Sequence, residues 1–236
     1  MGVDDRIDQS AMIQHNKKVP TAFTLTELLV LIAIVGGLAA LVVPAVKGGI
    51  HAAKSAKTVS HLKQTGGILL NYASENNNRL PNSYDSAVFN AGGARFFQGD
   101  VSFYAGLKFD FAKNPPFADM FYDPCLTQSV QHPWGSFGVN ESILGPGSEG
   151  VLITRISSPA SKVIYCSASG GATSFKTSWI FTGADFVSQG MSAGIYYADP
   201  RNRGKAASLF LDGHVELLDV KSMDQATRRK YFTLDP

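Results

Sequence analysis

A long uncharged and mostly apolar stretch near the N-terminus constrains this chain more than any other feature. Nineteen consecutive residues, Leu28 to Val46, carry no charge, and Lys47 ends the run. At about 1.5 Å of rise per residue, an α-helix of this length spans roughly 28 Å, close to the roughly 30 Å of a bilayer's hydrocarbon core. Length and composition therefore predict a membrane-spanning helix.

Glu27 does not fit a plain membrane anchor, because it stands at the start of this run. A carboxylate in or near a bilayer is costly, and such residues usually have a partner and a function. Lys17 and Lys18 precede the segment, which predicts a cytoplasmic N-terminus and an exported remainder. The expected location is the inner membrane, with a single pass.

The residues around Glu27 resemble a known processing site. The segment Ala22-Phe23-Thr24-Leu25-Thr26-Glu27-Leu28-Leu29 is similar to the prepilin-type segment of type IV pilins and type II secretion pseudopilins. The resemblance implies that a prepilin peptidase removes a leader of residues 1–22 and leaves an N-methylated Phe23. Family members usually carry Gly where this chain has Ala22.

The same resemblance implies a structural subunit and not an enzyme. The Phe23 amine and the Glu27 carboxylate would pair between adjacent subunits, since their offset of four residues is about one helical turn. Gly36, Gly37 and Pro44 match positions where the family's helix partly melts in the filament, and proline by itself kinks or breaks a helix. The expected partners are homologous pilin-like subunits in a helical filament, the prepilin peptidase and an inner-membrane assembly platform. The filament would stand in the periplasm or at the cell surface.

Beyond Lys47 the pattern becomes amphipathic and predicts that the helix continues over residues 47–75. Its apolar stripe is expected to pack on the globular domain and comprises Ile50, Ala53, Ala56, Val59, Leu62, Leu69 and Tyr72. The basic residues His51, Lys54, Lys57, His61 and Lys63 either contact lipid headgroups or form a solvated face. The Asn-rich segment before Pro81 should end the helix.

Residues 76–236 are rich in Gly, Ser, Asn and aromatic side chains, which favours sheet and loops over a helical bundle. The expected fold is α+β: a long N-terminal helix, membrane-spanning over residues 23–46, packed on the antiparallel sheet of an exported domain with extended loops. This arrangement is pilin-like.

A β-hairpin is predicted near the C-terminus. Two β-prone runs, residues 207–211 and 214–218, flank Asp212-Gly213, which suits a two-residue type I′ turn. Asp212, Gly213, His214 and Val215 also resemble the end of a signature in one group of pilin-like proteins, a His followed after nine residues by Asp-Gly. Asn202 stands where that His would be.

Three further segments resemble landmarks of the same group. They are Met120-Phe-Tyr-Asp-Pro-Cys125, Ser136-Phe-Gly-Val-Asn140 and a predicted strand over residues 162–167. Relatives often have an acidic residue at the end of that strand, where this chain has Ser167.

The cysteines, the net charge and the acidic residues do not by themselves predict a binding or catalytic site. Cys125 and Cys166 either form a disulfide in an oxidising compartment or remain two thiols. A net charge of +2 is too small to argue for nucleic acid. Major pseudopilins commonly bind calcium, but no recognisable ligand spacing assigns metal ligands here. The aspartates considered are Asp185, Asp199, Asp212 and Asp219.

Recognisable catalytic motifs are missing from the sequence: it contains no nucleophile elbow, zinc-protease motif, Walker loop or dinucleotide fingerprint. We therefore expect a non-enzymatic filament subunit. The alternative is an exported or membrane-anchored binding or hydrolytic domain with an ordinary secretory signal, which signal peptidase would cut after Ala45.

Overall fold

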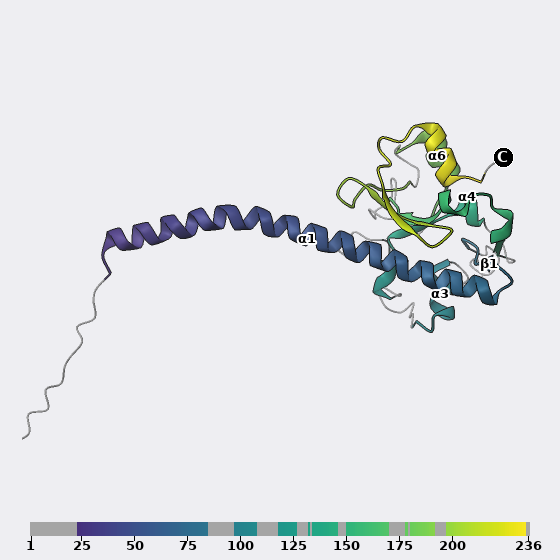
Figure 1. Cartoon of the computed structure of the whole chain (residues 1–236), viewed down its shortest axis with the longest axis horizontal. Helices are drawn as coiled ribbons and strands as arrows, with labels where there is room; N and C mark the ends of the chain where they lie inside the picture. Colours follow the sequence, from purple (N-terminus) through teal and green to yellow (C-terminus); the bar gives the residue numbers. More distant parts are fainter. Residues whose placement is uncertain are drawn as a thin grey trace, which may run out of the picture. The chain divides into compact units, whose positions relative to one another are not determined.

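The computed structural model describes residues 23–84, 97–107, 118–126, 132, 134–145, 150–169, 178, 180–191 and 197–234. The protein is α+β, with one long N-terminal helix followed by a mixed sheet and short helices (Figure 1). Two compact units, residues 1–47 and residues 48–236, are described separately below. The expected leader, residues 1–22, lies outside the described residues.

Helix α1 comprises Leu25–Glu75 and includes Gly36, Gly37 and Pro44. A break at Pro44 is not observed, because the helix continues on both sides of that residue. The loss of one backbone hydrogen bond bends a helix more often than it ends one. Both glycines have open space around them, so no neighbouring side chain among the described residues requires their small size.

The predicted apolar stripe on the second part of α1 is only partly correct. Leu62 and Leu69 are buried as expected, whereas Ile50 is half exposed. The buried face also contains small polar residues, and α1 buries Ser55, Thr58, His61, Leu62, Thr65, Gly66, Leu69 and Ala73. A threonine hydroxyl can be buried in a helix when it donates to the carbonyl four residues earlier, as Thr65 does to His61 at 3.1 Å. The spacing of apolar residues alone therefore predicted only part of the buried face of α1.

Helix α1 ends at Glu75, as the sequence predicts. Asn77 and Asn78 follow with φ of 55° and 57°, a left-handed conformation that asparagine tolerates better than most residues. The amide of Asn78 donates to the carbonyl of Ala73 at 2.8 Å and closes the helix end.

The main sheet has five strands in the order β5-β2-β4-β6-β7. Their bounds are β2 Phe137–Asn140, β4 Val163–Ser167, β5 Ile180–Phe181, β6 Ala206–Phe210 and β7 Val215–Leu218. All neighbouring strands are antiparallel except β2 and β5, which are parallel, so the expected antiparallel sheet is in fact mixed. A separate two-stranded sheet pairs β1 (Arg79–Leu80) with β3 (Val151–Leu152).

Short helices lie between the strands and after them. The α-helices are α3 Phe97–Tyr104, α4 Glu141–Leu144, α5 Gly183–Gln189 and α6 Gln225–Phe232. The 3₁₀ helices are η1 Asp119–Phe121, η3 Ile153–Arg155 and η4 Pro159–Ser161. Asp224 caps α6, because its carboxylate accepts from the amide of Thr227 at 2.7 Å.

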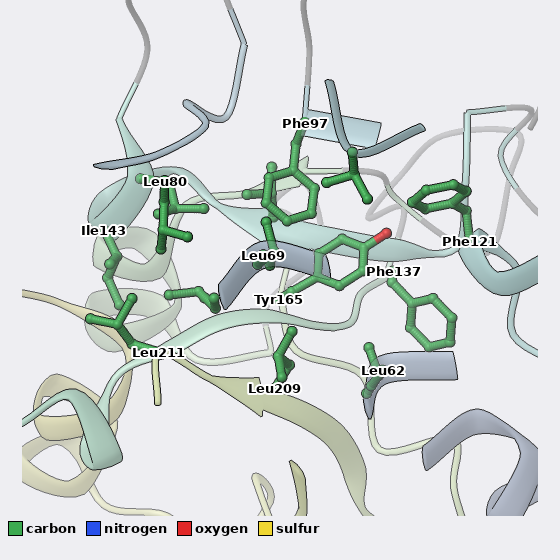
Figure 2. Close-up of a cluster of buried hydrophobic side chains, with 14 of the residues drawn as sticks. Leu62, Leu69, Leu80, Phe97, Phe121, Phe137, Ile143, Tyr165, Leu209 and Leu211 are labelled. Carbon is green, nitrogen blue, oxygen red and sulfur yellow. The ribbon is translucent and has the colours of Figure 1, made fainter. Parts of the chain in front are cut away.

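Two apolar clusters cover opposite faces of the main sheet. The alternation of β6 shows this, since Leu209 belongs to the cluster beneath α1 and Phe210 to the cluster beneath α5 and α6. Figure 2 shows Leu62 and Leu69 of α1 among the sheet residues Phe137, Tyr165 and Leu209. The amphipathic part of α1 is therefore an integral layer of the globular unit.

On the opposite face, aromatic packing holds the last helix in place. Phe232 of α6 meets Phe186 of α5 edge-on, with 4.9 Å between ring centroids. Edge-to-face pairs of this kind add to the stabilisation from burial alone. The C-terminal helix is thus packed into the fold (Figure 1).

Candidate functional site

The first part of α1 is the strongest functional feature of the chain. It is the one helix in the described part of the chain that is long and apolar enough to cross a membrane. None of its most apolar 18-residue window is buried within the chain. Large apolar side chains exposed in this number are rare on a soluble protein and mark a surface for lipid or for another protein.

Glu27 and Thr24 form a reciprocal hydrogen-bonded cap at the start of this helix. The backbone amide of Thr24 donates to Glu27 Oε2 at 2.9 Å, and the Thr24 hydroxyl donates to the same oxygen at 2.7 Å. In return, the amide of Glu27 donates to Thr24 Oγ1 at 3.2 Å. This is a capping box, which satisfies backbone amides that have no partner within a helix.

The predicted processing and assembly residues lie around this cap. Phe23 immediately precedes Thr24 and is 74 % exposed. Ala22, on the other side of the expected cleavage site, lies outside the described residues. The sequence analysis missed the capping box, although Thr-Leu-Thr-Glu contains its Thr-x-x-Glu pattern directly before an apolar run.

The C-terminal hairpin is present, but its turn differs from the predicted one. The β6 and β7 strands pair with Leu209 opposite Val215, and the amide of Gly213 donates to the carbonyl of Phe210 at 2.9 Å. Gly213 has a φ of 90°, whereas Asp212 is not among the positive-φ residues. The loop therefore has three residues, 211–213, and is not a type I′ turn. Residues 210–213 form a β-turn, and its last residue, Gly213, has the left-handed conformation.

Leu211 gives the physical reason for the longer turn. Its side chain is only 2 % exposed, and its amide donates to the carbonyl of Lys162 at 2.9 Å. A two-residue turn would place Leu211 in the strand ladder and remove both interactions. The buried leucine thus occupies the first turn position.

Asp212 and His214 stabilise this turn from the outside. Asp212 Oδ1 accepts from the amide of His214 at 3.1 Å and lies 2.5 Å from its Nδ1. The His214 ring stacks on Phe210, with 4.1 Å between centroids. These contacts give both residues a role in the hairpin.

A buried polar cluster around Asp123 joins segments that are far apart in the sequence. The Asp123 side chain is fully buried. Its Oδ1 accepts from the Thr58 hydroxyl of α1 at 2.8 Å and from the amide of Cys125 at 2.9 Å. Its Oδ2 lies 3.3 Å from Ser167 Oγ of β4 and 3.9 Å from Nε of Arg201. One carboxylate therefore connects α1, the segment after η1, the sheet and the loop before β6.

Residues from several of the segments quoted in the sequence analysis meet at this cluster. Asn202, at the position where the resembling signature has a histidine, donates to Ser167 Oγ at 3.1 Å and accepts from Cys125 Sγ at 3.1 Å. Ser136 Oγ accepts from the backbone amide of Asp123. Four of these positions therefore contact one aspartate: Cys125, Ser167 and Asn202 at its carboxylate, and Ser136 at its backbone amide. Sequence analysis did not identify Asp123 as its centre, although it lies within one of the segments quoted.

The two cysteines are free thiols. Cys125 lies on the α1 side of the sheet, 3.8 Å from Thr58 Oγ1. Cys166 belongs to the cluster beneath α5 and α6, on the opposite face. A disulfide requires the two Cβ atoms to face each other at about 4 Å, and in this structure the two thiols are unpaired and belong to opposite faces of the sheet. Burial raises the pKa of Cys125 to about 11 and raises that of Cys166 further, which lowers the thiolate fraction and hence the reactivity of both.

Metal ligands do not gather in the part of the chain that the structure describes. No group of three or more His, Cys, Asp or Glu side chains there could hold a metal ion. Asp212 contacts His214, and Asp199 forms an ion pair with Arg201 at 2.8 Å. The aspartates considered for calcium thus have other interactions or lie apart.

Comparison with known proteins gives no relative. No family model, curated protein or solved structure matches the chain.

Proposed function

We propose that this chain is a non-enzymatic subunit of a type IV pilus-like or type II secretion pseudopilus filament. The observation that carries the proposal is the exposed apolar part of α1 with Glu27 as the one charged residue between Lys18 and Lys47. An ordinary anchor needs the apolar residues but not the carboxylate. The subunit is stored in the membrane as a single-pass protein, with the globular unit exported, and is then extracted into the filament.

Processing between Ala22 and Phe23 supplies the second group that the proposal needs. Removal of residues 1–22 by a prepilin peptidase leaves a positively charged amine on Phe23, one residue before the capping box. Both bonds that Glu27 accepts from Thr24 end on Oε2, so among the described residues Oε1 remains available to an amine. The cap fixes the carboxylate at the start of the helix without consuming both oxygens.

Attraction between the amine and the carboxylate then favours assembly. Each group alone is poorly solvated in an apolar environment, and an unpaired buried charge is strongly destabilising. When adjacent subunits are staggered by about one helical turn, the amine of one meets Glu27 of the next and each neutralises the other. Such contacts are heterologous and do not close, so they propagate along a filament.

Two substitutions separate this role of Glu27 from its role in the cap. Glutamine also completes a capping box, so Glu27→Gln retains the cap and removes the charge. Thr24→Val removes the hydroxyl of the cap and retains the charge. We expect both variants to enter the membrane, Glu27→Gln to be lost from filaments, and Thr24→Val to assemble. Filament incorporation is measured by shearing and sedimentation of cells that express the assembly machinery.

The opposite result would contradict the pairing. If Glu27→Gln assembles normally and Thr24→Val does not, the carboxylate serves only to start the helix. Glu27→Ala removes both the cap and the charge, so it should be lost from filaments whichever of the two is needed. It therefore shows that the assay can detect a loss of assembly.

The division of the chain favours one second candidate, an exported domain released by an ordinary signal peptidase. The second compact unit begins at Gly48, and cleavage after Ala45 would leave that unit almost unchanged. Mass spectrometry of the mature protein distinguishes the two. A methylated Phe23 at the N-terminus supports the filament subunit, and Val46 supports the released domain.

A further inference from the structure

The part of α1 between the apolar segment and its last residue, Glu75, is basic and carries no acidic residue. Lys47, His51, Lys54, Lys57 and Lys63 occur there, and no Asp or Glu occurs between Leu28 and Ser74. Within the globular unit, His51 and Lys57 are exposed and Lys54 is half-buried. These three residues follow one another at a spacing of three, so they occupy neighbouring positions on the helix surface.

The charges of Lys54 and Lys57 are not neutralised by ion pairs in the described part of the chain. Neither lysine forms an ion pair there. Asp119 and Asp123 line the same pocket as Lys57, but neither carboxylate forms an ion pair with it among the described residues, and Asp123 already accepts the hydrogen bonds of the buried cluster. A positive surface with no acidic residue between Leu28 and Ser74 of its own helix fits an anionic partner.

We infer that His51, Lys54 and Lys57, here called the basic face, bind the headgroups of anionic phospholipids. The inference rests on the membrane-spanning part of the proposed function and not on filament assembly. The apolar segment ends at Val46, and along a helix the eight residues to Lys54 rise about 12 Å. A headgroup layer about 6 Å deep, together with a long lysine side chain, covers this distance for Lys54. Lys57 is about 4.5 Å further along the helix, which places its ammonium within a Debye length of about 8 Å of the headgroup surface.

The neighbouring residues favour a lipid surface over a nucleic acid. Ile50, between the apolar segment and the basic face, is 50 % exposed, and Ala52, Ala53 and Ala56 are exposed as well. Apolar side chains interleaved with lysines suit the boundary between headgroups and acyl chains. The large aromatic side chains Phe, Tyr and Trp, on which bases would stack, are absent from residues 48–64.

The test uses the full chain in nanodiscs of phosphatidylcholine mixed equally with phosphatidylglycerol. The chain is released with its bound lipids into a mild detergent, and native mass spectrometry gives the ratio of the two lipids retained. At about 1 kcal/mol for each lysine near an anionic surface, each lost lysine should lower phosphatidylglycerol enrichment by about fivefold. Lys54→Gln with Lys57→Gln should therefore abolish most of it.

Three controls make the result specific. Lys54→Arg with Lys57→Arg keeps the charge and should keep the enrichment. Lys63→Gln changes an exposed lysine nine residues beyond Lys54, on the opposite side of the helix, and should have little effect. Raised salt should reduce the enrichment of the unchanged chain.

Several outcomes would overturn the inference. Equal retention of both lipids by the unchanged chain, or unchanged enrichment in the double glutamine variant, rules out the basic face as a lipid site. Displacement of phosphatidylglycerol by duplex DNA at low concentration would assign the face to nucleic acid. Failure of the chain to enter nanodiscs would refute the membrane-spanning part of the proposed function, and this inference with it.

Discussion

Replacement of Asp123 by alanine is the most informative test of how the globular unit is held together. The substitution removes the carboxylate at the centre of the buried cluster and leaves its partners in place. The Thr58 hydroxyl loses an acceptor at 2.8 Å, and the Cys125 amide loses one at 2.9 Å. Arg201, whose side chain is 6 % exposed, keeps Asp199 but loses its second carboxylate.

The expected cost follows from what remains buried. Removing one partner of a buried charge pair costs about 3–5 kcal/mol, because the other charge stays desolvated. The total stability of a domain is about 5–15 kcal/mol, so Asp123→Ala should bring the globular unit close to unfolding. Thr58→Val removes one hydrogen bond to a charged acceptor and should cost less, about 1.5–3 kcal/mol.

The assay is urea unfolding of the full chain in a mild detergent, followed by tryptophan fluorescence. Asp219→Ala is the matched control, because Asp219 is exposed, and it should change stability by no more than about 0.5 kcal/mol. The reasoning predicts that Asp123→Ala is the most destabilising, followed by Thr58→Val and then by the control. A loss of less than about 1 kcal/mol in Asp123→Ala would refute it.

Three further predictions use the same unfolding assay. Burial lowers the pKa of His132 to about 4, so below its ordinary pKa of about 6.5 the unfolded chain binds a proton that the folded chain does not. Stability should therefore fall as pH drops from about 6.5 to about 4, and His132→Gln should reduce that slope; an unchanged slope counts against burial as the cause. Gly213→Ala should cost about 1–2 kcal/mol because of the φ of 90°, whereas Gly67→Ala, in a helix with open space around it, should be neutral or stabilising. Because both cysteines are free, a reducing agent should leave the unfolding midpoint unchanged, and a midpoint lowered by reduction would indicate a disulfide. The buried Cys166 should react with a thiol reagent only after unfolding, and therefore at a different rate from Cys125.

Local patterns in the sequence predicted much of the fold. The uncharged run and the Asn-rich segment before Pro81 correctly predicted a helix that ends at Glu75. The Asp-Gly pair correctly predicted the hairpin of β6 and β7. Both signals act over a few residues, where backbone preferences dominate.

The buried cluster could not be predicted in the same way. Thr58 and Asp123 are separated by 65 residues. Both are polar and belong to no apolar repeat, so the sequence pattern does not predict that they are buried. Tertiary contacts bring them together only when α1 packs on the sheet. For the same reason a buried Leu211 changed the turn type, since its burial depends on contacts beyond the hairpin.

Capping at the start of α1 is an intermediate case. The Thr-x-x-Glu pattern of Thr24 and Glu27 is local and readable, but a carboxylate beside an apolar segment also suggests a membrane partner. Within a single chain, the structure shows that Thr24 and Glu27 form the helix cap. The two roles are compatible, because the cap engages one carboxylate oxygen.

Chemical crosslinking between subunits tests the central claim most directly. Filaments assembled from equal amounts of isotopically heavy and light subunits are treated with an apolar carbodiimide, which joins an amine to an adjacent carboxylate. The account predicts peptides that link Phe23 of one subunit to Glu27 of another, half of them joining a heavy to a light chain. Intact filaments with no such link, or with links only within a chain, would contradict it.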